Sequence, residues 1–235
     1  MTSMSALPDA DDKARTVKAM FDRIAKRYDR TNQLMTFNAD QRWRRELVAR
    51  MGVSGVDTVL DLACGTGDFG RICLARGAKV IGLDFSLGML VEARKRSGSA
   101  VSLAQGDALQ LPVAAESISV AVVGFALRNF VAIAPVLHEL ARVIKPGGRL
   151  GLLEVDTPTS TIVRTGHSLY FNRLIPLVGG VLSGDRAAYR YLPASAAYLP
   201  SQSELLRMLK DAGFERIRKR SPMFGAIQSI DAVRS

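Results

Sequence analysis

The sequence predicts an α/β protein with a mostly parallel seven-stranded sheet and helices on both faces of that sheet. From residue 57 onward, short runs of aliphatic and β-branched residues alternate with segments of helical periodicity. The chain has 235 residues, of which 48% are hydrophobic, and this suits one substantial core. We expect a domain over residues 51–235 with a helical insertion at about 157–200, preceded by a tail and helical cover over residues 1–50.

An amphipathic helix is the first expected element, over residues 13–29. Its apolar residues recur at helical spacing with Lys and Arg between them, and they form the stripe Val17, Met20, Phe21, Ile24 and Tyr28. Such a stripe must cover an apolar surface. Either the helix packs against the domain, or it forms a lid over a substrate, or it contacts a membrane.

Five parallel strands are expected next, because each is a short aliphatic run followed by a turn or a helix. They span residues 58–62, 79–83, 101–104, 118–123 and 149–154. The connecting helices span residues 67–76, 87–95 and 132–144, and a Lys-Pro-Gly-Gly turn follows the last of them. Strands and helices that alternate in this way are typical of a parallel sheet.

The C-terminal part predicts one more helix and two closing strands. Ser201 and Glu204 fit a capping box at the start of a helix over residues 202–212, and Gly213 stands where a helix C-cap is expected. The runs at 214–219 and 226–233 then complete the sheet.

The net charge of +10 is concentrated at the two ends of the chain. Residues 1–50 hold eleven Lys and Arg against seven acids, and residues 205–235 hold seven against three. Basic ends on a nearly neutral body suit contact with an anionic membrane surface or a nucleic acid. A solvated basic face that serves solubility is the alternative.

The sequence also predicts a compartment. No apolar segment of signal-peptide length follows a basic start, so we expect a cytoplasmic protein, with peripheral contact at the inner face of the membrane. The apolar stretch 162–182 is interrupted by charged residues, proline and glycine, which predicts a buried or ligand-covering helical region instead of a membrane span. Cys64 and Cys73 indicate neither a disulfide scaffold nor a metal site. The oligomeric state stays open.

A glycine-rich turn follows the first strand. Asp61 lies near the end of that strand, and Gly65 and Gly67 let the backbone approach a ligand closely. The turn also matches the dinucleotide pattern G-x-G-x-x-G over residues 65–70, which alone is a weak signal. Asp61 and Asp68 would disfavour the pyrophosphate of a dinucleotide and favour the sulfonium cation of S-adenosyl-L-methionine. The turn therefore predicts the second cofactor.

Acids also follow the next two strands. Asp84 is placed to accept hydrogen bonds from both ribose hydroxyls of a nucleoside cofactor. After the third strand, Gly106, Asp107 and Ala108 offer a carboxylate for the adenine amino group beside a backbone N–H for a ring nitrogen. An ordinary turn is the alternative, but three acids at the ends of three successive strands favour the cofactor site.

Five segments carry a resemblance to a known family. They are Met20–Asp29 (MFDRIAKRYD), Leu60–Asp68 (LDLACGTGD), Phe125–Asn129 (FALRN), Lys145–Leu150 (KPGGRL) and Tyr189–Leu192 (YRYL). The chain resembles the class I methyltransferases and, more narrowly, the ubiquinone/menaquinone biosynthesis C-methyltransferases of the UbiE/MenG type, from about residue 20 to residue 225. The glycine turn and Lys-Pro-Gly-Gly are shared widely, whereas the other three segments are specific to the narrower family.

The resemblance implies a Rossmann-like class I methyltransferase fold and S-adenosyl-L-methionine as the cofactor. It places Thr66, Asp84, Asp107 and Ala108 on the family's cofactor-binding positions, and Gly124 on one where many relatives carry serine. The full expected cofactor site is Asp61, Gly65, Thr66, Gly67, Asp84, Phe85, Gly106, Asp107, Ala108, Gly124 and Phe125.

The chain departs from the family at several acceptor-side positions. Ala126 replaces the usual glycine of the Gly-Leu-Arg-Asn block, and Glu-Phe-Ser-x-Pro has become Glu-Val-Asp-Thr-Pro at residues 154–158. The usual ending with its His and Gly-Tyr-Lys is missing after Gly225.

The implied reaction is methyl transfer to a reduced quinone ring, from demethylmenaquinol to menaquinol or in the ubiquinol-pathway equivalent. A natural-product C- or O-methyltransferase acting on another phenol is the main alternative. A nucleic-acid methyltransferase is disfavoured because no basic run is interleaved with aromatic residues. The acids around the turn disfavour an NAD-dependent oxidoreductase, and a non-enzymatic cofactor-binding protein is a further alternative.

The implied chemistry selects candidate catalytic residues. A quinol ring carbon becomes nucleophilic when a hydroxyl loses its proton, so the site must stabilise a developing phenolate. Arg128 follows the fourth strand, and its charge would lower the pKa of that hydroxyl, directly or through a water. Asn129 could orient the hydroxyl. Alternatively, Arg128 pairs with Glu154 and braces the end of the sheet.

The expected covers supply the remaining candidates. His167, in the insertion, is a candidate general base. Tyr28, Asp29, Tyr189 and Tyr191 are candidate acceptor-binding residues, because they lie in the two segments expected to cover the site. The alternative is that these four residues pack the two covers against each other.

Overall fold

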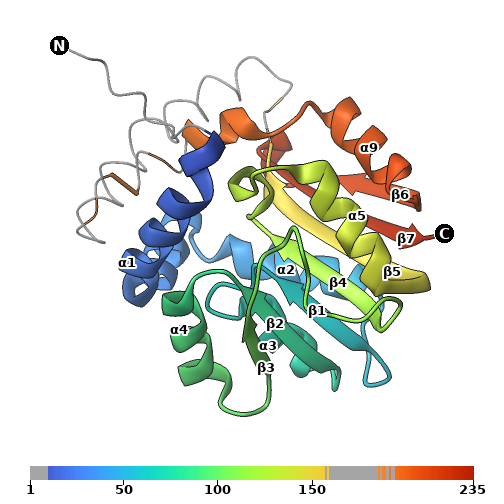
Figure 1. Ribbon diagram of the computed structural model, residues 1–235, viewed down its shortest axis with the longest axis horizontal. Coiled ribbons are helices and arrows are strands. Elements are labelled where there is room, and N and C mark those ends of the chain that lie inside the picture. Colours follow the sequence, from blue (N-terminus) through green and yellow to red (C-terminus); the bar gives the residue numbers. More distant parts are fainter. Residues whose placement is uncertain (1–9, 157, 159–184, 186, 189–190, 192–193) are drawn as a thin grey trace.

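The computed structural model describes residues 10–156, 158, 185, 187–188, 191 and 194–235. His167, Tyr189 and most of the insertion expected at about 157–200 lie outside the described residues. Figure 1 shows the arrangement of the described elements around one twisted sheet.

Seven strands form one sheet in the order β3-β2-β1-β4-β5-β7-β6. The strands are β1 Thr58–Leu62, β2 Lys79–Asp84, β3 Ser102–Gln105, β4 Ile118–Gly124, β5 Ile144–Val155, β6 Phe214–Arg220 and β7 Ile227–Arg234. The first five are parallel, whereas β7 runs antiparallel to both β5 and β6. The predicted fold class, a mostly parallel seven-stranded sheet, is confirmed.

Strand β5 begins earlier than the sequence indicates. It includes the Lys-Pro-Gly-Gly turn, because Ile118 of β4 pairs with Ile144 while Val120 already pairs with Arg149. The four turn residues bulge out of the ladder between these two pairs, and Gly147 adopts a φ of 74°. The preceding helix therefore ends at Val143.

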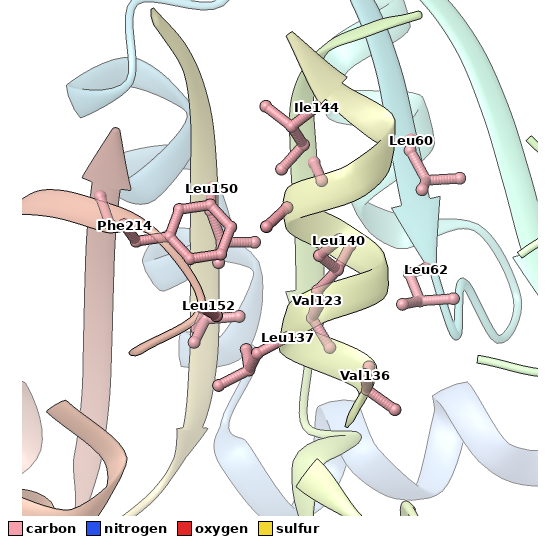
Figure 2. Close-up of a cluster of buried hydrophobic side chains, with 14 of the residues drawn as sticks. Leu60, Leu62, Val123, Val136, Leu137, Leu140, Ile144, Leu150, Leu152 and Phe214 are labelled. Atoms are coloured by element: carbon pink, nitrogen blue, oxygen red, sulfur yellow. The ribbon is translucent and has the colours of Figure 1, made fainter. Parts of the chain in front are cut away.

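Helices cover both faces of the sheet, as predicted. The described helices after β1 are α3 Asp68–Leu74, α4 Leu87–Ser97, α5 Ile133–Val143 and α9 Gln202–Asp211. Leu137 and Leu140 of α5 and Leu209 of α9 pack on one face, together with residues of β1, β4 and β5 (Figure 2). Helix α3 covers the other face through Phe69 and Cys73. Parallel strands buried on both faces explain their aliphatic composition.

Two helices precede the sheet, where the sequence predicted one. Helix α1 spans Ala10–Thr36 and helix α2 spans Ala39–Arg50. The chain turns between them at Phe37 and Asn38, which both have positive φ angles. The sequence does not indicate α2, because Arg, Glu and Asp dominate it and its apolar surface is small, yet its Trp43, Leu47 and Val48 are buried on the α3 face of the sheet.

Most of the apolar stripe of α1 is buried against the domain, as the packing alternative predicts. Val17, Met20, Phe21 and Ile24 form a separate cluster with Met89 of α4. Figure 1 shows α1 beside α4, at one side of the sheet. Among the described helices, none combines the length and the apolar character that a membrane crossing requires.

Candidate active site

A cavity of about 570 Å³ opens at the carboxyl ends of strands β1 to β4. Turns after these strands supply most of its wall, and α1 covers it with Ala14, Lys18, Phe21 and Tyr28. Open α/β sheets bind ligands at this edge, and the volume lies in the range of small-molecule sites. The predicted site residues that line it are Tyr28, Gly65, Asp84, Phe85, Gly106, Asp107, Ala108, Gly124, Phe125 and Asn129.

Asp84 presents a buried carboxylate to this cavity. Its Oδ2 accepts a hydrogen bond from the Gly65 N–H at 2.8 Å and its Oδ1 accepts one from the Ser86 N–H at 2.8 Å. A carboxylate has about four lone pairs, so each oxygen can accept another donor. Burial raises the Asp84 pKa to about 6, against these backbone hydrogen bonds, which lower it. The residue therefore fits the two hydroxyls of a cofactor ribose.

The turn after β3 forms the neighbouring wall. The Asp107 Oδ1 accepts a hydrogen bond from the Leu109 N–H at 2.9 Å, which orients its carboxyl group beside Ala108. Gly106 is required by a close approach, since a Cβ atom there would lie 2.7 Å from Leu83 Cδ2. These residues fit an adenine base, which needs one acceptor and one backbone donor along its edge.

Backbone strain marks two cavity residues. Ala63 and Phe125 have φ angles of 51° and 57°, a region that residues other than glycine rarely occupy. Both line the cavity, and strained backbone of this kind is concentrated at functional sites. Sequence reasoning missed Ala63, because nothing in the chemistry of alanine signals a ligand.

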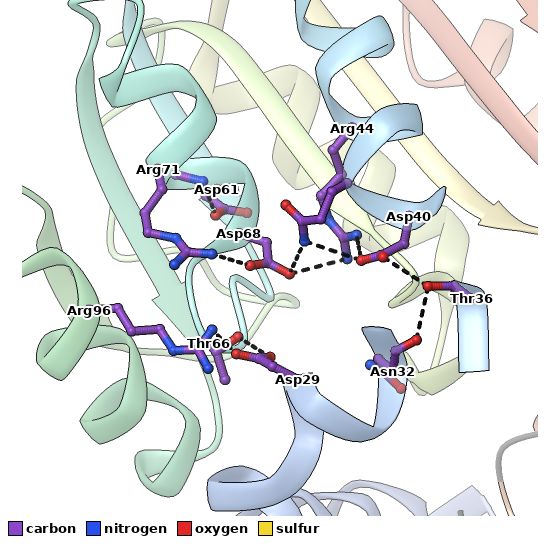
Figure 3. A network of polar contacts seen from close by, with 12 residues as sticks. Asp29, Asn32, Thr36, Asp40, Arg44, Asp61, Thr66, Asp68, Arg71 and Arg96 are labelled. Atoms are coloured by element: carbon purple, nitrogen blue, oxygen red, sulfur yellow. Dashed lines mark hydrogen bonds and ion pairs between the residues drawn. The ribbon is translucent and has the colours of Figure 1, made fainter. Parts of the chain in front are cut away.

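The structure differs from the sequence interpretation of Asp61 and Asp68. Neither lines the cavity. Asp61 accepts a hydrogen bond from the Gly70 N–H at 2.8 Å, and burial raises its pKa to about 7. Asp68 contacts the basic residues Arg71 and Arg44 and also accepts from Gln41 (Figure 3). Asp68 is therefore paired with arginines and Asp61 with a backbone N–H, and neither carboxylate faces the cavity.

The cavity wall itself disfavours a pyrophosphate. Asp84 and Asp107 line it, and among the described lining residues Lys18 is the one cation. A dinucleotide would bring two phosphate charges to this wall, whereas a sulfonium brings a positive charge. The sequence predicted a preference for a sulfonium over a pyrophosphate from Asp61 and Asp68; in the structure, Asp84 and Asp107 are the carboxylates that support it.

Thr66, Gly67 and Gly124 each have a structural role within the protein. The Thr66 hydroxyl donates a hydrogen bond to Asp29 Oδ1 at 2.6 Å, and Gly67 precedes the first residue of α3 with a φ of 86°. A Cβ atom at Gly124 would lie 2.7 Å from Phe69 Cε2. The Phe69 ring therefore occupies the space that a serine side chain would need at position 124.

The far end of the cavity contains the acceptor candidates. Tyr28, Phe125, Asn129 and Phe130 line it. The Tyr191 hydroxyl donates to Asn129 Oδ1 at 3.4 Å, from a position behind the wall. Tyr191 and Asp29 do not line the cavity, and their predicted contact with an acceptor stays a prediction.

Arg128 forms the ion pair with Glu154 that the sequence offered as its alternative role. Arg128 is 7% exposed and Glu154 is fully buried at 0%. Within the described part of the chain, Arg128 Nε has no hydrogen-bond partner. Arg128 does not itself line the cavity, whereas its chain neighbour Asn129 does.

The charge of Arg128 nevertheless reaches the cavity wall. Burial raises the pKa of Tyr28, and Arg128 is the largest influence that lowers it. Burial raises the pKa of Tyr191 to about 12, and Arg128 again opposes this shift. The hydroxyl of a third phenol beside Tyr28 would meet the same two influences: burial, which raises its pKa, and the Arg128 charge, which lowers it.

Lys13 holds the start of α1 against this end of the site. Its Nζ donates to the Phe130 carbonyl oxygen at 2.6 Å and lies 3.8 Å from the centre of the Tyr198 ring. Sequence reasoning missed Lys13, Ala14 and Lys18, because they flank the apolar stripe on which the helix was recognised. Helical spacing places positions 14, 18, 21 and 28 on one side of the helix, and that arithmetic could have found the lining residues.

Cofactor binding is expected to weaken as the pH falls through about 6. Asp84, which the sequence predicts to accept from both ribose hydroxyls, loses acceptor capacity when it is protonated, and its pKa is about 6. The dissociation constant for S-adenosylmethionine, measured by calorimetry, should rise about tenfold between pH 7 and pH 5.

The raised pKa of Asp84 has the opposite effect on the stability of the fold. The Asp84 contribution to stability is fully present below its unfolded pKa near 3.8 and is lost as the pH rises through 6.

Two variants assign this pH step. Asp84→Asn should bind weakly at every pH and lose the step. Asp61→Asn should keep it, although burial also raises the Asp61 pKa, to about 7, because Asp61 lies outside the cavity wall. A step that persists in Asp84→Asn and vanishes in Asp61→Asn would contradict the assignment.

The chain matches the model of the ubiE/COQ5 methyltransferase family over residues 9–234. It is 37% identical to a protein of Syntrophotalea carbinolica named ubiquinone/menaquinone biosynthesis C-methyltransferase UbiE, over 93% of this chain and 94% of that protein. It is 39% identical to a demethylmenaquinone methyltransferase of Corynebacterium kroppenstedtii, over 92% of this chain and 93% of the relative.

Solved structures share the fold at lower identity. A SAM-dependent methyltransferase of Aquifex aeolicus gives a TM-score of 0.60 at 16% identity, over 82% of this chain and 89% of that one. A complex of the Haloferax volcanii Trm112 activator with a putative methyltransferase gives 0.65 at 19% identity, over 91% and 96%. The chain therefore belongs to the ubiE/COQ5 methyltransferase family and is an S-adenosylmethionine-dependent methyltransferase.

Proposed function

We propose that this enzyme transfers a methyl group to a ring carbon of a reduced quinone, converting demethylmenaquinol to menaquinol. The observation that carries the proposal is a single cavity with two chemically different ends. Asp84 and Asp107 lie at the ends of β2 and β3 and suit a nucleoside, whereas Asn129 and Phe130 follow β4, on the other side of β1, and suit a phenolic ring together with Tyr28 of α1. The names of the two relatives, which both methylate quinone precursors, support this acceptor.

The bound cofactor supplies an electrophilic methyl group on a sulfonium. Asp84 holds the ribose, and the turn with Asp107 and Ala108 holds the adenine. Ala63 and Phe125, the two lining residues with strained backbone, lie at the ends of β1 and β4 in the wall of the same cavity. A fixed cofactor and a fixed acceptor convert an encounter in solution into a reaction between neighbours, which lowers the barrier.

Arg128 and Asn129 act on the acceptor hydroxyl. The Arg128 charge favours ionisation of a phenol placed beside Tyr28, as it does for Tyr28 itself. Asn129 lines the cavity and orients that hydroxyl, while Tyr191 holds the Asn129 amide from behind. A general base takes the hydroxyl proton, and the resulting phenolate makes its neighbouring ring carbon nucleophilic. Once methylated, that carbon loses its own proton, which restores the aromatic quinol. The same proposal includes His167 as the general base and Tyr189 as a contact to the acceptor. It also includes the division of the chain into a helical cover over residues 1–50 and a methyltransferase domain over residues 51–235.

The proposal includes a cytoplasmic location with peripheral contact at an anionic membrane surface. A quinol with an isoprenoid tail resides in the bilayer, so the enzyme must meet it there. The basic segments 1–50 and 205–235 suit anionic lipids, and Phe37 and Phe224 are each 84% exposed. Exposed phenylalanine side chains can bury at the boundary between lipid headgroups and acyl chains.

The test is transfer of labelled methyl from S-adenosylmethionine to demethylmenaquinol, a demethylated benzoquinol and bulk RNA in parallel. Each acceptor is offered with and without reductant, and the quinols are offered in anionic and in zwitterionic vesicles. We expect labelling of demethylmenaquinol that requires reductant and is faster in anionic vesicles. The oxidised quinone should stay unlabelled, because it has no hydroxyl to ionise.

Each other outcome redirects the assignment. Labelling of the benzoquinol alone selects the ubiquinol-pathway reaction. Tight cofactor binding with both quinols unlabelled overturns the proposal and selects a natural-product phenol as the acceptor. Labelled RNA would overturn the proposal and select a nucleic-acid methyltransferase, although the sequence has no basic run interleaved with aromatic residues.

A further inference from the structure

Helix α1 carries a second functional edge beside its cavity-lining side. Asp22 and Asp29 are seven residues apart, which places their side chains within about 20° of each other around the helix. This pair of carboxylates flanks the side that presents Phe21 and Tyr28 to the cavity. Each carboxylate contacts one of the two turns that hold the cofactor.

Asp22 contacts the turn after β2. Its Oδ1 accepts a hydrogen bond from the Ser86 hydroxyl at 2.6 Å and another from the Gly88 N–H at 2.9 Å. The same Ser86 donates its N–H to Asp84, the carboxylate that faces the cavity. A Cβ atom at Gly88 would lie 3.0 Å from the Asp22 backbone, so helix and turn are in close contact.

Asp29 contacts the glycine turn after β1. It accepts the Thr66 hydroxyl hydrogen bond at 2.6 Å and pairs with Arg96 of α4 (Figure 3). Asp29 and Thr66 are both buried. The residue before Thr66 in the turn, Gly65, donates its N–H to Asp84. Asp22 therefore contacts Ser86, one of the two residues that donate to Asp84, and Asp29 contacts Thr66, the chain neighbour of the other donor, Gly65.

We propose that Asp22 and Asp29 are positioning residues that hold α1 over the bound cofactor. The Thr66 hydroxyl contributes to cofactor binding by anchoring Asp29, not by a contact of its own with the cofactor. The proposal rests on S-adenosylmethionine occupying the cavity. With both contacts made, Phe21 and Tyr28 close the cavity wall, and the turns that orient Asp84 are fixed. Losing either contact frees α1 from one turn, which should weaken retention of the cofactor more than the chemical step.

A double-mutant cycle between Thr66→Val and Asp29→Ala tests this coupling. The readout is the dissociation constant for S-adenosylmethionine without acceptor, so failure of quinol methylation would not affect it. Each single variant should weaken binding about tenfold, the scale of a buried hydrogen bond to a charged group. The double variant should bind no more weakly than the weaker single variant. At saturating cofactor, kcat should stay within about threefold of the wild type.

Matched variants separate positioning from general damage. Thr66→Ser keeps the hydroxyl and should bind like the wild type. Asp22→Ala should weaken binding, whereas Asp12→Asn, on the same helix and paired with exposed Arg15, should not. Where Asp29→Ala fails to fold, Thr66→Val takes its place, because it removes the same hydrogen bond. Asp29→Asn keeps an acceptor for Thr66 and should bind the cofactor as Arg96→Gln does, because both variants remove the same ion pair.

Two results would overturn the proposal. Additive effects of Thr66→Val and Asp29→Ala would mean that Thr66 acts on the cofactor independently of Asp29. Unchanged cofactor affinity in Asp22→Ala and Asp29→Ala, with the fold intact by circular dichroism, would mean that α1 does not hold the cofactor.

Discussion

Replacing Arg128 with methionine is expected to lower kcat about 100-fold to 1,000-fold, while the dissociation constant for S-adenosylmethionine changes little. The magnitude is that of losing one group that stabilises developing negative charge in a site protected from water. Arg128 already lowers the pKa of the neighbouring phenols Tyr28 and Tyr191 against the effect of burial. Methionine removes the charge and keeps a side chain of similar length. It also leaves Glu154 buried without its partner, so the pH profile and the double variant described below separate acceptor ionisation from this structural cost.

The pH profile of this variant identifies the cause. Raising the pH supplies the phenolate without help from the protein, so the deficit of Arg128→Met should narrow as the pH rises. Steady-state rates with demethylmenaquinol from pH 6 to pH 9 measure this. A deficit that is the same at every pH would contradict the electrostatic role and leave Arg128 as a structural brace.

Replacing Glu154 with alanine is expected to reduce the free energy of unfolding by about 3–5 kcal/mol. This is the usual cost of removing one partner from a buried ion pair, because the other charge stays buried without compensation. Glu154 is 0% exposed, and its Oε1 contacts Arg128 and also accepts from the Val155 N–H at 2.9 Å. Denaturation by urea, monitored by circular dichroism, gives the measurement.

The double variant Arg128→Met/Glu154→Leu separates stability from catalysis. Two apolar side chains can replace a buried ion pair with little loss of stability, so most of the lost free energy of unfolding should return. The methyl transfer rate should stay as low as in Arg128→Met. Loss of less than about 1 kcal/mol in Glu154→Ala would instead indicate that water reaches the pair, as at exposed ion pairs.

Much of the fold could be predicted because its signals are local. The strand runs around Val59, Ile81 and Val122 are aliphatic, since parallel strands are buried on both faces. Ser201 caps α9 as its capping box predicts, accepting from the Glu204 N–H at 3.3 Å. Helix α2 could not be predicted in the same way, because its helical conformation depends on burying Trp43 and Leu47 against the sheet.

The candidate site divides along the same line. Asp84, Asp107 and Asn129 were placed correctly at the cavity, since residues at the carboxyl ends of parallel strands meet at one edge. Asp61 was expected to face the cofactor as well, but its side chain points toward Gly70 of α3 instead. Which way a strand-end side chain turns depends on the helix packed behind it, and no local pattern encodes that choice.

The sequence by itself determined the α/β architecture, the family and the strand ends at which ligands bind, because periodicity, turn chemistry and motif spacing are properties of neighbouring residues. Only the tertiary structure decided that Arg128 pairs with Glu154, that Asp29 holds Thr66 and that Phe69 fills the space beside Gly124. Each of these contacts joins residues from different elements. Their geometry is set by how helices and strands pack, and packing is a collective property of the whole chain.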